Sequence, residues 1–383
     1  MAKLLDRIDV NLDSMTRALM PPPDWYLDSR FLELEQERVF RRTWQWVGHV
    51  GQIAAPGAYF TCEVAGDPLI VVRGEDGRLR AFSNVCLHRG ALIAQGEGTV
   101  TRFRCPYHQW TYGLDGSLRG TPFFQRMDGD ETCLPQVPVD TWGPLVFVNL
   151  DPQAQPLAET LGDLPERFQR YRLEELACVQ RVAVKGACNW KVHQENAREC
   201  YHCPSIHPSF TAAYEVENFE TELFDFYSVS FVNQRCAGPP PEIGTESLAT
   251  LARDVVGFRR QSPARQGLEG RDETGYYYLH IFPSLTVILA PDHIVVSKIT
   301  PDGVEGLTMD RAWFFESTAG PQAEAVRANV EFRLGNVRED MAICESVQKG
   351  LRSRHRKLCR YSPKELSVYH FHSILKRLLG SAG

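Results

Sequence analysis

Two short stretches of the sequence concentrate side chains that bind transition metals. VCLHRG at 85–90 and FRCPYHQW at 103–110 each hold one cysteine and one histidine, and ENARECYHCPSIHP at 195–208 holds two of each. Thiolates and imidazoles are the side chains that zinc, copper and iron take in proteins. The spacing of the cysteines and histidines within each stretch therefore indicates which of these metals the stretch binds.

The first site is predicted at Cys86, His88, Cys105 and His108. Each Cys–His pair stands where a strand-like run gives way to a turn, so two similar loops would present one thiol and one imidazole each to a common point. That donor set suits a two-iron cluster with two thiolates on one iron and two imidazoles on the other. A structural zinc site is the alternative, although such sites usually group their cysteines and their histidines in separate pairs, whereas here they are interleaved.

The second site is predicted around His202 and His207. On one unbroken helix two residues five positions apart would point about 140° away from each other, but Pro204 interrupts the helix. We expect a helix before the break, with Glu199 and His202 on one face, and a turn that brings His207 back to the same metal. A zinc site that uses the two cysteines of this stretch and a pair of purely structural histidines are the alternatives.

A third ligand is needed if this metal is iron that activates O2, because such sites use two histidines and one carboxylate and leave other positions open. A long helix is expected over 321–352, and Val337 and Cys344 belong to its apolar stripe. Asp340 lies on that stripe, and a carboxylate on a buried face is costly unless it is paired or binds a metal. Asp340 is therefore the predicted third ligand, with an Asp at the edge of the stripe as the alternative, and Glu339 is expected to be solvated.

The chain length of 383 residues predicts two domains that position these residues. Short β-type runs separated by turn signals predict a small antiparallel β domain, and the rest predicts an α+β domain in which an antiparallel sheet packs with long helices. We expect an N-terminal helical segment over 1–45 that packs on the catalytic domain, the β domain over 46–152 and the catalytic domain over 153–383.

Composition narrows the class of protein further. The net charge of −6 gives no general case for nucleic acid or an anionic membrane as partner. The N-terminus does not read as a secretory signal, and no run approaches the ~20 apolar residues of a membrane span, so a cytoplasmic protein is expected. Eleven cysteines in such a chain favour reduced thiols and metal ligands over disulfides.

Both motifs carry a family resemblance. CLHRG and CPYHQWTYGLDG resemble the Rieske domain of Rieske-type non-haem iron oxygenase α subunits, in which these cysteines and histidines hold the cluster and the aromatic at Trp110 packs near it. ENARECYHCPSIH is similar to the E-N-x-x-(D/E)-x-x-H-x4-H signature of the catalytic domain, and REDMAICESVQKG to the helix that carries the third ligand, at Asp340. The resemblance covers nearly the whole chain and implies a helix-grip catalytic domain, one [2Fe–2S] Rieske cluster and one mononuclear Fe(II) per subunit.

The same resemblance implies catalytic roles for Asn196 and Glu199. In relatives the acidic residue three before the first iron histidine connects that histidine to a Rieske histidine of the neighbouring subunit, so Glu199 would link His202 to His108 across a subunit boundary. This arrangement implies a homotrimer. The chain has no nicotinamide or flavin fingerprint such as G-x-G-x-x-G, so a separate NAD(P)H-dependent flavin or iron–sulfur reductase is the expected partner.

The substrate expectation rests on the glutamate followed by CYHC, which is more like the branch of glycine betaine, carnitine and stachydrine monooxygenases. It implies hydroxylation and N-demethylation of a small quaternary or tertiary ammonium compound. Aromatic faces hold such cations, and the candidates are Tyr201, Phe210, Tyr278, Phe282 and Trp313. Ring hydroxylation or O-demethylation of an aromatic acid is an alternative, and a Rieske electron carrier or redox sensor is an alternative of another class.

Overall fold

The computed structural model describes residues 11–124, 132–235, 275–290, 293–315 and 321–380. The chain forms two compact units, one of residues 1–34 with 161–383 and one of residues 35–160. Residues 35–45 and 153–160 belong to the second of these compact units. The order of elements, strands first and then a sheet with long helices, confirms the predicted α+β class.

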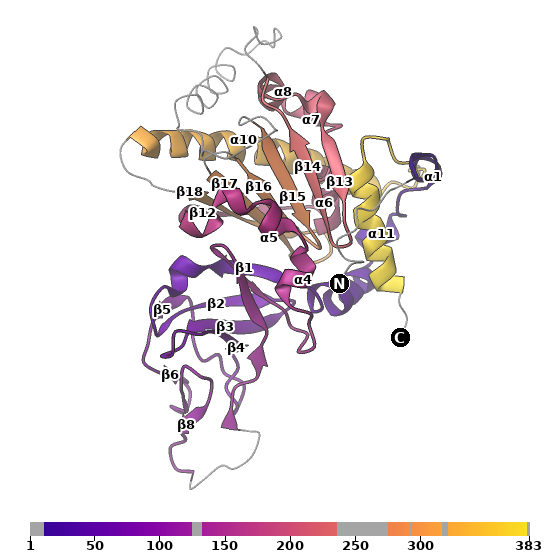
Figure 1. Cartoon of the computed structure of the whole chain (residues 1–383). Helices are drawn as coiled ribbons and strands as arrows, with labels where there is room; N and C mark the ends of the chain where they lie inside the picture. The colour runs from indigo at the N-terminus through magenta and orange to yellow at the C-terminus, as the bar shows by residue number, and fades with distance from the viewer. Residues whose placement is uncertain (1–10, 125–131, 236–274, 291–292, 316–320, 381–383) are drawn as a thin grey trace. The chain divides into compact units, whose positions relative to one another are not determined.

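The unit of residues 35–160 is built from three antiparallel sheets and short helical turns (Figure 1). Its five-stranded sheet has the order β5 (Glu97–Thr99), β2 (Ala58–Val64), β3 (Asp67–Arg73), β4 (Leu79–Ser83) and β9 (Gln136–Val137). The three-stranded sheets are β1 (Gln45–His49), β11 (Leu145–Val148) and β10 (Val139–Trp142), and β6 (Phe103–Arg104), β7 (Thr111–Tyr112) and β8 (Leu118–Gly120). Its described residues also form a π-helical turn, Gln36–Phe40, a 3-10 turn, Val50–Ile53, and most of the short helix α4 (Leu157–Leu161).

Strand β3 is the central element of this unit, because both of its faces are buried. Leu69 and Val71 pack into one hydrophobic cluster, and Ile70 and Val72 pack into another. Side chains alternate across a strand, so the uninterrupted LIVV run is what a strand between two cores requires. The cluster on the side of Ile70 also holds both cysteines of the first predicted site.

The other unit is organised around a seven-stranded antiparallel sheet (Figure 1). Its order is β12 (Ala177–Gly186), β18 (Leu307–Phe315), β17 (His293–Pro301), β16 (Leu285–Leu289), β15 (Tyr276–Ile281), β14 (Tyr227–Val232) and β13 (Glu220–Leu223). Nearly all side chains from β14 to β18 are buried, so both faces of the sheet are covered.

Helices cover this sheet and carry the second predicted site. Helix α6 (Trp190–Ala197) packs against β17 and against the long helix α10 (Pro321–Leu351), and α11 (Leu366–Gly380) packs against β13 and α6. The predicted helix over 321–352 thus forms, with Pro321 at its first position, where a missing N–H costs nothing. The shorter helices of this unit's described residues are α1 (Leu12–Arg17), α2 (Asp24–Leu27), α3 (Ser29–Glu35), α5 (Leu164–Arg167), α7 (Cys203–Ile206) and α8 (Pro208–Ala213), with 3-10 turns at Gln169–Tyr171, Leu173–Glu175 and Val216–Asn218.

The N-terminal segment packs on the end of the chain within the same unit. Met15 lies in a small cluster with Tyr361 and Val368, and the Met20 N–H donates to the Cys359 carbonyl at 2.9 Å.

Among the helices that the structure describes, none combines the length and the apolar character that crossing a bilayer requires.

Candidate metal centres

The first site is formed by two loops with the same backbone, at 86–91 and 105–110. In each loop the cysteine N–H donates to the carbonyl five residues later, at 2.9 and 2.8 Å, and the cysteine carbonyl accepts from the N–H four residues later, at 2.9 and 3.1 Å. The residue at that fourth position, Gly90 in one loop and Gln109 in the other, has a left-handed φ of 73° or 61°. The sequence therefore builds the same turn twice, although only one copy uses the glycine that this conformation favours.

The four donor side chains of these loops lie close together. Cys86 and Cys105 are free, buried thiols in one hydrophobic cluster. The rings of His88 and His108 lie 4.5 Å apart between centroids, and His88 stacks on Trp110 at 4.9 Å with an interplanar angle of 5°. Two thiols and two imidazoles on a pair of matched loops form the donor set that a Rieske [2Fe–2S] cluster requires.

Tyr112 contacts one of these thiols. Its hydroxyl lies 3.2 Å from Cys86 Sγ and accepts a hydrogen bond from the Leu87 N–H at 3.1 Å. Because the oxygen already accepts from the backbone, its own proton is available for the sulfur. Burial, and then the hydrogen bond with Cys86, raise the pKa of Tyr112 far above its ordinary value, so the hydroxyl stays a donor.

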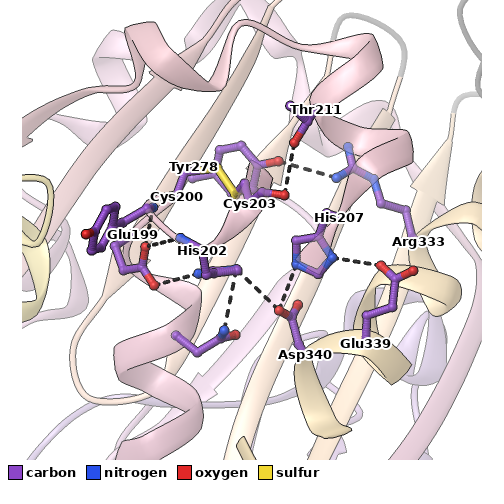
Figure 2. Close-up of a disulfide and its surroundings, with 12 residues drawn as sticks. Glu199, Cys200, His202, Cys203, His207, Thr211, Tyr278, Arg333, Glu339 and Asp340 are labelled. Atoms are coloured by element: carbon purple, nitrogen blue, oxygen red, sulfur yellow. Dashed lines mark hydrogen bonds and ion pairs between the residues drawn. A yellow bond between two sulfur atoms is a disulfide. The ribbon is translucent and has the colours of Figure 1, made fainter. Parts of the chain in front are cut away.

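The second site brings together His202, His207 and Asp340, whose ligand atoms all lie within 4.8 Å of one another (Figure 2). Asp340 Oδ1 is 2.8 Å from His207 Nε2 and 3.4 Å from His202 Nε2. Both rings thus present the same nitrogen to one carboxylate oxygen. Two imidazoles and a carboxylate converging from one side are the donor set of a non-haem iron site with open positions.

The local fold differs from the expectation for this segment. We expected a helix through Glu199 and His202 that ends before Pro204, but α6 ends at Ala197 and Pro204 lies in the first turn of the next helix, α7. Proline is well suited to a first turn, because the N–H that it lacks has no partner there. His202 and His207 cap the two ends of this one-turn helix, and their ring centroids are 5.2 Å apart.

Each metal-site histidine has a carboxylate on its second nitrogen. Glu199 Oε1 lies 2.5 Å from His202 Nδ1, and its other oxygen accepts the backbone N–H groups of Tyr201 and His202. Glu339 Oε2 lies 2.8 Å from His207 Nδ1 (Figure 2). Such contacts fix the tautomer and direct Nε2 towards the metal.

The expectation that Glu339 is solvated holds only in part. Its side chain is 38% exposed, yet it holds a ring nitrogen of His207. Adjacent residues on a helix point about 100° apart, so a stripe that contains Asp340 gives no signal for its neighbour. Only the position of His207, which the fold sets, reveals the contact.

Three carboxylates around two imidazoles give this centre an excess of negative charge. Burial opposes protonation of His202, but hydrogen bonds to Asp340 and Glu199 outweigh it and raise the pKa of His202 to about 9. Burial would likewise raise the pKa of Asp340, but its hydrogen bonds with both histidines lower that pKa instead. Without metal the site thus favours a proton on His202, and a divalent cation is the natural replacement for it.

The three ligand-type residues line a cavity of about 110 Å³. About 10–15 Å³ of such volume accommodates one water, so the space suits a compact molecule. Asn196 lines it, with Nδ2 3.4 Å from His202 Nε2. Of the five aromatic candidates, Phe210 and Tyr278 line the cavity, and Phe219, which the sequence reasoning missed, joins them.

The other three aromatic candidates lie elsewhere. Tyr201, in the bend between α6 and α7, is 64% exposed and does not line the cavity. Phe282 is buried near Phe226 and Phe371, and the fully buried Trp313 lies under Arg311. As the sequence gave no way to rank these aromatics, the placement of their strands decides which ones face the site.

Cys200 and Cys203 form a disulfide beside His202 (Figure 2). The expectation of reduced thiols was wrong for this pair, and the alternative of a zinc site on these sulfurs falls with it. Their Cα atoms are 4.9 Å apart, within the range that a disulfide requires. The bend that joins α6 to α7 produces this approach.

Family models cover most of the chain. Residues 173–381 match the ring hydroxylating alpha subunit (catalytic domain), and residues 43–138 match the Rieske [2Fe–2S] domain. The chain belongs to the ring-hydroxylating α subunits. This oxygenase therefore has a [2Fe–2S] cluster in its Rieske domain and mononuclear iron in its catalytic domain, as the sequence predicted.

Two relatives align over nearly the whole oxygenase, and a third aligns over about half of it. The choline monooxygenase of Atriplex hortensis is 27% identical over 94% of this chain and 78% of its own. The carnitine monooxygenase oxygenase subunit of Escherichia coli K12 is 27% identical over 93% of both chains, and the glycine betaine monooxygenase oxygenase subunit of Pseudomonas aeruginosa is 35% identical over 51% of this chain and 47% of its own.

Solved structures confirm the fold. The quaternary ammonium Rieske monooxygenase CntA superposes with a TM-score of 0.80 at 24% identity, covering 96% of this chain and 97% of its own. Naphthalene 1,2-dioxygenase from Rhodococcus sp. gives a TM-score of 0.72 at 21% identity, covering 94% and 95%. Both likenesses bear out the predicted architecture of a β-rich Rieske domain followed by a catalytic domain.

Replacing Tyr112 by Phe is expected to lower the reduction potential of the Rieske cluster, because hydrogen bonds to cluster sulfurs stabilise the reduced state. An EPR-monitored redox titration measures the effect. Tyr59→Phe is the matched control, since the Tyr59 hydroxyl donates to the Gln95 carbonyl, at 3.5 Å, and forms no hydrogen bond with a cluster cysteine among the described residues. Equal potentials for wild type and both variants would contradict the role given to the Tyr112 hydroxyl.

Replacing Glu339 by Ala is expected to weaken iron binding in the catalytic domain by roughly 10-fold, because the partner of a ligating histidine sets its orientation and basicity. Competition with a chelator, followed by iron analysis, measures the affinity. Glu331→Ala removes an exposed carboxylate from the same helix and is expected to leave it unchanged. If both variants lose iron alike, only the charge of the helix matters, and the contact with His207 does not.

Proposed function

We propose that this chain is the oxygenase component of a monooxygenase that hydroxylates and N-demethylates a small quaternary or tertiary ammonium compound. The observation that carries the proposal is that relatives aligned over more than nine-tenths of the chain act on choline or carnitine, as their names state. The cavity supports it, since Phe210, Phe219 and Tyr278 supply aromatic faces beside the metal site.

The residue roles follow from the geometry. His202, His207 and Asp340 would hold the mononuclear iron, and Cys86, His88, Cys105 and His108 would hold the [2Fe–2S] cluster. The bound iron supplies O2 activation next to the substrate C–H bond. Because the three protein ligands approach from one side, the opposite side is left to the cavity and to the substrate.

The chain's own residues orient the ligands and shape the cavity. Glu199 and Glu339 hold the Nδ1 atoms of the two histidines, so each ring keeps its Nε2 towards the metal. Asn196 offers an amide beside the ligating face of His202. The aromatic residues exclude water and favour a methylated ammonium group, which has no N–H to donate.

The reaction consumes one O2, two electrons and two protons and converts an N-methyl group to N-CH2OH with release of water. The carbinolamine then releases formaldehyde and leaves an amine with one methyl group fewer. The electrons come from NAD(P)H through a separate reductase, which the family uses. The proposal also includes a specific reductase partner and a cytoplasmic location. It includes a homotrimer in which Glu199 connects His202 to His108 of the neighbouring subunit.

Two other functions are weaker candidates. The fold shared with naphthalene 1,2-dioxygenase is compatible with ring hydroxylation or O-demethylation of an aromatic acid. An electron carrier or redox sensor would need only the Rieske domain. It would give no role to the catalytic domain or to the His202–His207–Asp340 cluster.

Anaerobically purified oxygenase with its iron restored, a generic reductase and NADH is expected to take up O2 and release formaldehyde with at least one ammonium compound. A panel of choline, glycine betaine, carnitine, stachydrine and benzoates tests this. Formaldehyde equimolar with O2 for an ammonium compound is the expected result. O2 uptake with benzoates alone would move the chain to the aromatic-acid alternative.

Glu199→Gln is expected to retain both iron centres but to lower turnover by roughly 10- to 100-fold, because the neutral amide holds the Nδ1–H of His202 less strongly. Turnover is measured alongside metal content and rapid single-turnover oxidation of the cluster. Glu174→Gln, at an exposed position of the same unit, is the control. A variant with normal cluster-to-iron electron transfer and normal turnover would remove Glu199 from the mechanism.

A further inference from the structure

Two buried arginines line the cavity that holds the metal site. Arg311 on β18 is 7% exposed and Arg333 on α10 is 3% exposed. Among the residues that the structure describes, no carboxylate forms an ion pair with either guanidinium. A buried charge without a partner costs several kcal/mol in ordinary circumstances, so their presence beside a ligand cavity calls for a functional reason.

The contacts of Arg333 leave part of its guanidinium available. Its Cζ lies 4.4 Å from the centroid of the Tyr276 ring, and Nη1 donates a long bond of 3.4 Å to the Tyr278 hydroxyl (Figure 2). Nε and Nη2 have no hydrogen-bond partner in the part of the chain that is described. The tyrosines therefore hold the group in place without neutralising it.

Arg311, on β18, is held in the same manner. Its Cζ lies 5.5 Å from the centroid of Trp313, and its Nε has no partner within the described residues. In the sheet register Arg311 pairs with Ser297, which pairs in turn with Thr286, so the three side chains share one face and all line the cavity. The Ser297 hydroxyl also has no partner among the described atoms.

The two guanidiniums act on one region of the cavity. Burial, and then the positive charge of Arg333, lower the pKa of Arg311 to about 10. Arg311 therefore remains charged at neutral pH, and so does Arg333, whose pKa is raised because neighbouring tyrosines outweigh its burial. Two like charges converging in a cavity attract an anion, and planar guanidinium groups bind carboxylates in a bidentate manner.

The position of this region relative to the metal site follows from α10. Arg333 precedes Asp340 by seven residues, which is two helical turns, so both lie on the same face about 10 Å apart along the axis. Asn336 and Val337 lie between them and also line the cavity. A substrate that extends along α10 would therefore place one end at the histidines and the other at the arginines.

We infer that Arg311 and Arg333, with the Ser297 hydroxyl, form an anion subsite for the carboxylate of the substrate. The substrate is then a zwitterion with a methylated ammonium group and a carboxylate, and a bare cation such as choline is excluded. The ammonium half of this statement rests on the proposed function, whereas the carboxylate half rests on the arginines alone. Among the named relatives' substrates, carnitine and glycine betaine carry a carboxylate and choline does not.

The test compares carboxylates with analogues that lack the charge. Glycine betaine, stachydrine, carnitine and benzoate are each paired with the corresponding carboxamide, and choline is added as the cation without a carboxylate. Binding to the iron-loaded oxygenase is followed by thermal shift and calorimetry, and turnover by O2 uptake. At least one carboxylate is expected to bind roughly 10- to 100-fold more tightly than its amide, as hydrogen bonds between charged groups do.

Variants test whether the two arginines cause the tighter binding of the carboxylate. Arg311→Gln and Arg333→Gln are each expected to lose most of the carboxylate-over-amide preference, and the lysine variants to retain part of it because they keep the charge. Arg327→Gln, at an exposed position of α10, is the matched control and is expected to keep the full preference. An unchanged preference in both glutamine variants would overturn the inference.

The stability of the variants separates this role from a structural one. Removing the Arg311 charge, which burial disfavours, is expected to leave the melting temperature of the ligand-free protein unchanged or higher. If the arginines serve only to hold the tyrosines and Trp313 together, the melting temperature falls and the carboxylate preference stays. That result contradicts the anion subsite even where turnover is lost.

The outcomes for this inference and for the proposed function are distinct. Benzoate bound and oxidised in an arginine-dependent manner, with no ammonium compound accepted, leaves the anion subsite standing and overturns the ammonium proposal. Choline oxidised with no effect of either arginine leaves the ammonium proposal standing and overturns the subsite. Failure of every carboxylate to bind better than its amide also overturns it.

Discussion

The catalytic unit depends on one buried carboxylate. Asp340 lies on the inward face of α10, where an ionised side chain is tolerated only beside hydrogen-bond donors or a cation. His202 and His207 provide the donors, and they reach it because a one-turn helix, α7, separates them. The charges of Glu199 and Glu339 behind the rings then make a divalent cation the partner that satisfies the whole cluster.

The same helix places the two ends of the cavity. Asp340 stands at the metal end, and Arg333 lies two turns earlier on the same face, opposite Arg311 on the sheet. The sheet register aligns Arg311 with Ser297 and Thr286. A negatively charged metal site and a positively charged region thus face one small space, and this is the basis for inferring a zwitterionic substrate.

The Rieske unit builds its metal site from two copies of one loop. Two loops with the same hydrogen bonds each supply one cysteine and one histidine, and a strand buried on both faces, β3, supports the cluster of side chains behind them. Gln109 adopts the left-handed conformation that Gly90 adopts in the other loop. The backbone geometry is therefore imposed by the fold and not by glycine alone.

Motif spacing was enough to predict both donor sets, the long helix that carries Asp340 and the α+β class, because each depends on local patterns of a few residues. Glu339, Phe219 and the two arginines were not predictable in this way. Glu339 lies off the apolar stripe, and Arg311 and Arg333 stand in runs where an arginine is normally solvated. Their roles depend on which strands and turns meet across the sheet, as does the approach of Cys200 to Cys203.

The role of Asp340 is tested by comparing the Mössbauer spectrum of iron-57-enriched wild-type protein with that of Asp340→Asn. We expect about three iron atoms per wild-type chain, two in a Rieske cluster and one in a separate high-spin ferrous site, as these centres require. In the variant the ferrous signal is expected to disappear while the cluster signal is kept. A ferrous signal that survives unchanged in Asp340→Asn would show that this buried carboxylate does not hold the catalytic iron.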